Sequence, residues 1–322
     1  MKPSIRLHFA ILLALFAVTA SAQQYPSKPI RLILGFAPGG AADYVSRVIS
    51  EPLGRALGQP IIIENRAGAG STIAAELVAK SAPDGYTVLI ASSSAISVNP
   101  ALNPKIGYKP SDLLPVTKVS ASPQVVAVNP ATGITSIREL IAVSKKEPGK
   151  LNYATSGNGS APHMATILFT RLTSTDMVHV PYKSGGLAVQ SVLAGDTQVT
   201  FATPPSVLPF VKAGRLRAIA VTSRKRSPLV PDLPGMEESG VADYDMSLWY
   251  GFFVPVGTPP DVIRKIFDAT HAALRETAVR DAFAREGTET AASKSPEDFA
   301  AFLAEDARLM VRLVKESGAK ID

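Results

Sequence analysis

The chain has 322 residues, of which 46% are hydrophobic and 19% charged, and it contains 26 prolines, 23 glycines and no cysteine. This composition excludes an intrinsically disordered chain and a collagen-like or other low-complexity polymer. The lack of cysteine excludes a disulfide framework and a thiolate metal site. The length predicts two domains, each large enough to bury a core.

Residues 1–22 have the order of a secretory signal peptide. Two basic residues precede an apolar run over residues 9–18, and Ala20 and Ala22 follow with the spacing of a cleavage site. The apolar run is too short to span a bilayer, and no later stretch is long and apolar enough. We therefore expect a mature chain that starts at Gln23 and is exported to a bacterial periplasm.

The formal net charge of +6 is spread along the chain, and the one basic cluster is Arg224-Lys225-Arg226. No aromatic residues are interleaved with this triplet, so it predicts a solvated loop rather than a nucleic-acid surface. We expect no nucleic-acid partner. A mild positive charge also favours the approach of anionic solutes by weak steering.

From Ile30 onward, short β-rich runs alternate with amphipathic helical stretches. Strands are predicted over residues 30–35, 61–64 and 86–91. The helix after the first strand ends at Gly58, with Pro52 inside it, and the next helix ends near residue 81. Repeated strand–helix–strand units predict a parallel sheet with right-handed crossovers.

A second series follows a break over residues 99–123, which have no sustained helical period. The predicted strands of this series cover residues 124–128, 151–154, 177–180, 199–202 and 216–221, with helices between them. The first of these helices opens with a capping box at Ser136-x-x-Glu139. Residues 227–244 are predicted as a loop, residues 249–254 as a strand, and the chain after Pro259 as helical.

The terminal helical block has almost no strands, so we expect it to pack back on the first sheet. Domain 1 is then discontinuous, formed by residues 23–123 and 247–322, and domain 2 spans residues 124–246. Two chain crossings, near residues 115–126 and 245–252, would form a hinge.

Ligands of open parallel sheets bind at the carboxyl ends of the strands, where the next helix begins. Five such loops are rich in Gly, Ser and Thr: residues 36–43, 65–72, 92–94, 155–160 and 203–205. Small residues let backbone N–H groups approach a ligand, and a helix N-terminus favours negative charge. Arg66 is the one cation in these loops. Any single loop fits an ordinary turn, but five of shared composition on two sheets predict a cleft for a small carboxylate held by amides and hydroxyls.

Several residues in these loops have two interpretations. Asp43 suits a first-turn carboxylate paired with Arg47 better than a direct ligand. His163 fits a hydrogen-bond donor to an anion and, equally, an exposed residue of a first helical turn. Trp249 is more typical of a core, although its place at a hinge allows stacking on a ligand.

Enzyme signatures are mostly absent from the sequence. There is no His-Glu-x-x-His motif, no Gly-x-Ser-x-Gly elbow, no complete dinucleotide fingerprint and no phosphate-binding Gly-Lys-Ser/Thr. Ser160 and His163 have no evident third member for a catalytic triad. We expect no catalysis, no cofactor and no metal.

The chain resembles the Bug family of periplasmic solute-binding proteins, the receptor component of tripartite tricarboxylate transporters. The matching stretches run through nearly the whole mature chain, in order and spacing that are specific. They are Tyr25-Pro26-x-Lys28-Pro29-Ile30, Pro38-Gly39-Gly40-x-x-Asp43, Glu64-Asn65-Arg66-x-Gly68-x-Gly70, Pro83-Asp84-Gly85-Tyr86-Thr87, Ser156-Gly157-x-Gly159-Ser160-x-x-His163, Val180-Pro181-Tyr182-Lys183, Gly214-Arg215-Leu216-Arg217-Ala218, Trp249-x-Gly251 and Pro255-x-Gly257-Thr258-Pro259.

The resemblance implies an α/β fold, a two-lobed type II periplasmic-binding-protein clamshell in which each lobe is a mostly parallel sheet flanked by helices. It implies that residues 37–43 and 156–163, one loop from each lobe, hold a ligand carboxylate through backbone amides and ordered waters. Residues 92–94 and 203–204 would decide which acid binds. The expected ligand-binding residues are Ala37, Gly39, Gly40, Ala41, Asp43, Ala69, Ser92, Ser93, Ser156, Asn158, Gly159, Ser160, His163, Thr203 and Trp249.

The favoured hypothesis is a monomeric periplasmic receptor that closes over a small organic acid and docks on cytoplasmic-membrane transporter subunits. A second hypothesis keeps the binding but has the closed form signal to a sensor kinase. A third is a secreted hydrolase that uses Ser160 and His163.

Overall fold

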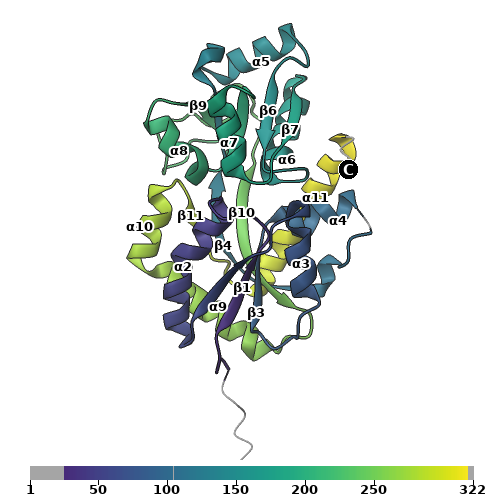
Figure 1. Ribbon diagram of the computed structural model, residues 1–322, viewed down its shortest axis with the longest axis vertical. Coiled ribbons are helices and arrows are strands. Elements are labelled where there is room, and N and C mark those ends of the chain that lie inside the picture. The colour runs from purple at the N-terminus through teal and green to yellow at the C-terminus, as the bar shows by residue number, and fades with distance from the viewer. Residues whose placement is uncertain (1–24, 104, 318–322) are drawn as a thin grey trace, which may run out of the picture.

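The computed structural model describes residues 25–103 and 105–317, and these residues form two α/β lobes, each built around one sheet (Figure 1). The predicted signal peptide lies outside the described residues. Among the helices that are described, none combines the length and the apolar character that a membrane span needs.

The sheet of the first lobe has six strands in the order β11-β4-β10-β3-β1-β2. The first three strands predicted for this lobe, β1, β2 and β3, pair in parallel, and β10, the fourth, runs antiparallel to both β3 and β4. The strands are β1 (Ile30–Leu34), β2 (Ile61–Asn65), β3 (Thr87–Ala91), β4 (Leu113–Pro123), β10 (Ser247–Pro255) and β11 (Glu289–Thr290).

The helices of the first lobe cover this sheet with their apolar faces. In α2 (Ala41–Leu57), Val45, Ile49 and Leu53 are buried, and Gly58 ends the helix because its φ of 75° lies in the left-handed region. Pro52 lies inside this helix, as the sequence predicts. The other helices are α3 (Thr72–Ala79), α4 (Asn99–Leu102), α9 (Pro260–Arg275), α10 (Thr277–Arg285) and α11 (Pro296–Ser317).

The sheet of the second lobe has five strands in the order β7-β6-β8-β5-β9. Its strands are β5 (Val125–Val128), β6 (Asn152–Thr155), β7 (Val178–Pro181), β8 (Val199–Ala202) and β9 (Arg217–Val221). Its helices are α5 (Ile137–Lys146), α6 (Ala161–Thr173), α7 (Gly185–Ala194) and α8 (Pro204–Lys212). Ser136 caps α5 by accepting from the Glu139 amide, as the capping box predicts.

Both sheets have the same internal order. The first parallel strand, β1 or β6, lies between the second and the third, and an antiparallel strand, β10 or β5, follows the third. In each case this antiparallel strand leads to or from the other lobe. The prediction of a two-lobed α/β architecture is therefore confirmed. The expectation that each sheet is mostly parallel is wrong, because both sheets are mixed: the chain segments that pass between the lobes, and the strands paired with them, run antiparallel.

Two adjacent chain segments connect the lobes. One runs from β4 through Gln124 into β5, and the other returns from β9 to β10, which crosses between the lobes in Figure 1. Thr222 joins both segments, because its N–H donates to the Gln124 carbonyl (2.8 Å) and its hydroxyl donates to the Met246 carbonyl (2.7 Å). The same hydroxyl accepts from the Gln124 N–H at 2.7 Å. These bonds make a compact two-segment hinge.

Residues 99–123, where the sequence pattern breaks, contain regular elements that the sequence did not predict. They contain α4 and the eleven-residue strand β4, which pairs with β10. The register between the two strands shifts twice, between Tyr250 and Gly251 and between Phe252 and Phe253. These irregularities break the alternation of side chains that identifies a strand in a sequence.

The last helix contacts both lobes. Phe299, near the start of α11, packs with Trp249 and Phe253 in a core cluster of the first lobe. Met310 and Leu313, three turns later, belong to the core cluster of the second lobe. The helix therefore bridges the hinge, and the domain boundaries at residues 123/124 and 246/247 stay a prediction.

Candidate functional site

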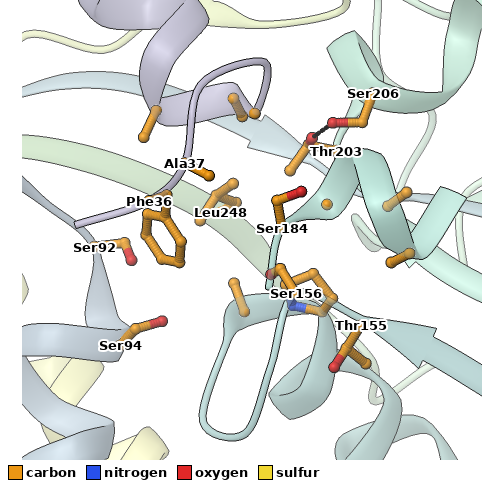
Figure 2. Close-up of a pocket in the computed structure, with 18 of the residues that line it drawn as sticks. Phe36, Ala37, Ser92, Ser94, Thr155, Ser156, Ser184, Thr203, Ser206 and Leu248 are labelled. Carbon is orange, nitrogen blue, oxygen red and sulfur yellow. Dashed lines mark hydrogen bonds between the residues drawn. The ribbon is translucent and has the colours of Figure 1, made fainter. Parts of the chain in front are cut away.

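A cavity with about 570 Å³ of empty space, its open mouth included, lies between the lobes (Figure 2). Loops, helix starts and strand β10 of the first lobe form one wall, with Phe36, Ala37, Gly40, Ala41, Ala42, Ser92, Ser94, Leu248 and Tyr250. The other wall comes from the second lobe, with Thr155, Ser156, Ala161, Pro162, Ser184, Gly185, Ala188, Thr200, Ala202, Thr203 and Ser206.

Four helices begin at this cavity: α2 from the first lobe and α6, α7 and α8 from the second. Gly40 and Thr203, the N-cap residues of α2 and α8, form no side-chain capping bond. The first N–H groups of a helix have no partner within the helix. In α2 one of them, that of Ala42, donates to the phenol oxygen of Tyr250, which also lines the cavity. The positive ends of four helix dipoles favour an anion between them.

No charged side chain lines the cavity in the described part of the chain. Arg66, the cation expected in the loops, is instead paired with Glu64 at 2.9 Å and is half exposed. Burial raises the pKa of Tyr250, so its phenol stays neutral. An anion in the cavity would therefore meet backbone N–H groups and hydroxyls rather than a salt bridge.

Asp43 stabilises the loop of the first lobe, residues 36–43, by hydrogen bonds, although it does not line the cavity itself. Its Oδ2 accepts from the Gly39 N–H (3.1 Å) and from Nε of Arg47 (2.9 Å), and its Oδ1 accepts from the Asn65 amide (3.3 Å). Burial by itself would raise the pKa of Asp43, but the hydrogen bonds from Arg47, Gly39 and Asn65 hold it below its usual value. Gly39 has a φ of 86°, which this turn requires and glycine adopts without strain.

Two stacked histidines stabilise the loop of the second lobe, residues 156–163. Nδ1 of His163 accepts from the Gly159 N–H at 3.1 Å, and the ring stacks on His179 with centroids 3.9 Å apart. Nε2 of His179 is in turn 2.6 Å from the Thr155 hydroxyl. Burial lowers the pKa of His163 to about 3 and that of His179 to about 4. Both rings are neutral near pH 7, so this loop too places no charge at the cavity.

Residues 45–319 match a family model described as the tripartite tricarboxylate transporter family receptor. The chain belongs to this receptor family. It is 38% identical over 307 residues to protein BugT of Bordetella pertussis, covering 95% of this chain and 94% of BugT. The resemblance noted in the sequence is thereby confirmed, and with it membership of a periplasmic solute-binding family.

Several solved structures share the fold of this receptor. A periplasmic transporter matches with a TM-score of 0.87 and 38% identity, over 92% of this chain and 100% of that chain. A protein of R. palustris with adipate matches with a TM-score of 0.87 and 30% identity, over the same shares. MatC of Rhodopseudomonas palustris with bound malate matches with a TM-score of 0.84 and 29% identity, over 90% and 100%. The clamshell fold expected from the resemblance is confirmed.

Some of the predicted ligand-binding residues of the receptor line the cavity, and others lie behind or beside it. Those that line the cavity are Ala37, Gly40, Ala41, Ser92, Ser156 and Thr203. Three others, Gly39, Asp43 and His163, form hydrogen bonds that hold the loops in place without lining the cavity. Ser160 caps α6 by accepting from the His163 N–H. Ser93 is buried between two lining residues.

Three more of the predicted residues lie where the lobes of the receptor meet. The Asn99 side chain donates to the carbonyls of Gly70 (2.6 Å) and Ala69 (3.3 Å) in the first lobe. A Cβ atom at Gly159 would lie 2.6 Å from Oδ1 of Asn99, and one at Gly70 would lie 3.3 Å from the Asn158 carbonyl. Ala69, Asn158 and Gly159 are thus placed at a contact between the lobes, beside the cavity.

Trp249 does not line the cavity of the receptor. Its Nε1 donates to Asp306 at 2.9 Å, and its ring meets the edges of Phe299 and Phe302 at centroid distances of 5.7 and 5.6 Å. The core role, the more typical one for a tryptophan, is the one that the structure shows.

Sequence reasoning missed part of the cavity wall. Ser184 and Gly185 begin α7 directly after a predicted strand, so the criterion that selected the other loops also applies to them. Ser94, which also lines the cavity, directly follows the predicted ligand-binding residues Ser92 and Ser93. Thr200 and Ala202 alternate along the buried strand β8, whose four residues are all buried. A strand buried on both faces gives no sequence signal for the face that meets a ligand.

Proposed function

We propose that this protein is a periplasmic receptor that captures a small organic acid by its carboxylate and delivers it to membrane subunits of a tripartite transporter. Its family consists of solute-binding receptors for such transporters. Two structural relatives at 29–30% identity have the carboxylic acids malate and adipate bound. Export to the periplasm and a monomeric state are parts of the same proposal.

The observation that supports carboxylate binding is the convergence of four helix N-termini on a cavity without charged lining residues. Hydrogen bonds from N–H groups to an ionised acceptor are stronger than bonds between neutral groups. A neutral ligand would gain less from the same N–H groups and nothing from the dipoles. The cavity therefore favours an acid over its amide.

Because the cavity has one wall from each lobe, a bound ligand would favour closure of the clamshell. The lobes, taken as residues 23–123 with 247–322 and residues 124–246, would rotate about the hinge at Thr222. The lobes contact each other at several places, among them the Asn99–Gly159 contact, the packing of α11 on the second-lobe core, and the place where a Cβ atom on Gly287 would lie 2.8 Å from Cβ of Pro204. A ligand held by both lobes would stabilise this closed arrangement.

Thermal unfolding in the presence of candidate ligands tests the proposal. Mono-, di- and tricarboxylates and aromatic acids are compared with their neutral amides at matched concentration. A ligand that binds only the native state stabilises it by about 2.7 kcal/mol at a hundredfold excess over Kd. Acids are expected to raise the melting temperature and amides are not. Equal shifts by acids and amides would contradict carboxylate recognition.

The output of binding is tested in cells. If the receptor serves uptake, deletion of the transporter genes abolishes accumulation of the ligand that the melting assay identifies. If the closed form signals to a sensor kinase instead, accumulation persists and ligand-dependent transcription is lost when the receptor is deleted. The first result supports the transport role, and the second contradicts it.

A further inference from the structure

Three consecutive residues before α3 have a left-handed backbone. The φ angles of Ala69, Gly70 and Ser71 are 44°, 61° and 78°. Glycine adopts such angles without strain, but a residue with a Cβ atom adopts them at a cost in free energy. In the described part of the chain, the one other non-glycine residue with such a φ is Ser174, at the end of α6. Two of the three strained positions thus lie in the single turn Ala69–Ser71.

The same turn carries a second local cost. Ser71 is only 1% exposed, and its Oγ has no hydrogen-bond partner among the described residues. It is the N-cap residue of α3, yet its side chain makes no capping bond. An N-cap serine normally has an extended backbone and accepts from an N–H group of the first turn. A strained backbone and an unsatisfied buried hydroxyl persist together only where the surrounding structure holds them in place.

Within the first lobe, the turn is held by the buried side chain of Asn99. Its Nδ2 lies 2.6 Å from the Gly70 carbonyl oxygen, 3.2 Å from Oγ1 of Thr72 and 3.3 Å from the Ala69 carbonyl oxygen. A side-chain amide nitrogen has two hydrogens, so it cannot form three full hydrogen bonds. Asn99 by itself therefore holds the turn incompletely.

The second lobe contacts both the turn and the side chain that holds it. A Cβ atom on Gly70 would lie 3.3 Å from the Asn158 carbonyl oxygen, and one on Gly159 would lie 2.6 Å from Oδ1 of Asn99. With the lobes in contact, the loop of the second lobe leaves the turn and Asn99 little room to move. The left-handed turn is thus confined from both sides exactly where the two lobes meet.

Resting on the proposed closure over an acid, we propose that the turn Ala69–Ser71 is a strained contact that opposes closure of the empty receptor. When the lobes separate, Asn158 no longer confines the turn, which relaxes toward unstrained backbone angles. The strain is then a cost of the closed form alone, and a bound ligand must offset it. It lowers the closed fraction of the empty receptor, and the apparent affinity for the ligand falls by the same factor.

Ala69→Gly tests this inference by removing the Cβ atom that makes the left-handed angle costly. Ala69 is exposed and does not line the cavity, so the variant removes no ligand contact. Relief of one strained residue, offset in part by the freedom that glycine adds to the open form, predicts about three- to tenfold tighter binding. Calorimetric titration measures it, with the carboxylic acid that most raises the melting temperature of the unmodified protein. Unchanged or weaker binding overturns the inference.

Ser174→Gly is the matched control. It relieves the same kind of strain, at a φ of 49°, but at the end of α6 that lies away from the cavity. The affinity of this variant for the acid should equal that of the unmodified protein. If both glycine variants tighten binding equally, the effect is not specific to the contact between the lobes, and the inference is wrong.

The conformation of the empty receptor is measured without any ligand. Because the chain has no cysteine, one exposed residue of each lobe can be replaced by cysteine and labelled for single-molecule fluorescence energy transfer: Glu51 in α2 and Lys145 in α5. Ala69→Gly is expected to raise the closed population about three- to tenfold, in line with the gain in affinity. Ser174→Gly should leave it unchanged. Equal closed populations with and without Ala69→Gly contradict the inference.

These measurements separate failure of this inference from failure of the proposed function. If acids bind the unmodified protein but Ala69→Gly changes neither the affinity nor the closed population, the receptor for organic acids stands and the strained contact is wrong. If no acid binds, or if amides bind as tightly as acids, the proposed function fails. The fluorescence measurement then still tests the strained contact, because it needs no ligand.

Discussion

The two loops that face the cavity from opposite lobes present backbone N–H groups in similar ways but are held by opposite chemistry. The loop of the first lobe is braced by an ionised carboxylate, Asp43, paired with Arg47. The loop of the second lobe is braced by neutral rings, with His163 stacked on His179. In neither loop does the stabilising group, the Asp43 carboxylate or the His163 ring, place a charge in the lining of the cavity. The comparison also predicts that the two loops respond differently to substitution and to pH.

The largest effect is expected from Gly40→Val in the loop of the first lobe. Gly40 has a φ of −94°, and the nearest atom to an added Cβ is 3.9 Å away, so valine fits the fold. Its side chain would occupy the space where the ligand approaches the N–H groups of α2. Loss of two hydrogen bonds to a charged group predicts roughly a hundredfold weaker binding, or about 3 kcal/mol. Calorimetry with the best acid measures it, and circular dichroism verifies the fold.

The equivalent change in the other loop should act differently. Gly159 has a φ of 70°, and an added Cβ would clash with Asn99 across the lobes. Gly159→Val should therefore lower the melting temperature of the ligand-free protein, which Gly40→Val should not. If Gly40→Val binds its acid normally, the cavity does not hold the carboxylate at α2.

The second effect is a loss of stability in acid that originates in the loop of the second lobe. The folded pKa of His163 is about 3, below the ordinary value of 6.5, so between these values the unfolded chain binds more protons. Stability then falls as the pH drops through 6.5. From pH 7 to pH 5, His163 is expected to contribute a loss of about 2 kcal/mol, measurable by urea unfolding at each pH.

His163→Asn isolates this contribution. The asparagine oxygen can still accept from the Gly159 N–H, but it does not titrate. The variant should be less stable at pH 7 because the stacking is lost, and its stability should change less between pH 7 and pH 5. Asp43 has a pKa below its usual value, so it is ionised throughout this range and adds no slope. An unchanged slope in His163→Asn would show that the acid sensitivity originates elsewhere.

The smallest effects on ligand affinity are expected from substitutions of Asp43 and Arg47, which stabilise the loop of the first lobe. Asp43→Asn removes the charge that holds the Gly39 and Arg47 donors, and one such hydrogen bond is worth about 1 kcal/mol. Binding of the best acid should weaken about fivefold, without a change in its pH dependence between pH 5 and pH 7. Arg47→Gln serves as the control, and because Arg47 is more than half exposed, its loss should barely change affinity. A larger effect for Arg47→Gln than for Asp43→Asn would contradict this order.

The sequence predicted those parts of the fold and site that depend on local patterns. The end of α2 at Gly58, the cap at Ser136 and strands β1, β2, β3 and β8 were found because each signal lies within a few residues. The loops containing Gly40 and Ser156 were found because they join a buried strand to a helix. Strand β4 was missed because its bulged pairing with β10 hides the alternation of its side chains.

The sequence by itself determined the family, the two-lobed α/β architecture and the glycine-rich loops between strands and helices, since these follow from local periodicity, turn residues and ordered motifs. Only the tertiary structure decided which residues support those loops and which line the cavity. His179 reaches His163 because β7 pairs with β6 in register, with Tyr153 opposite His179. Ser97, in the same helical segment as the lining residue Ser94, donates to Asp306, more than two hundred residues later. Contacts between distant segments arise from packing of the whole chain, and no local pattern encodes them.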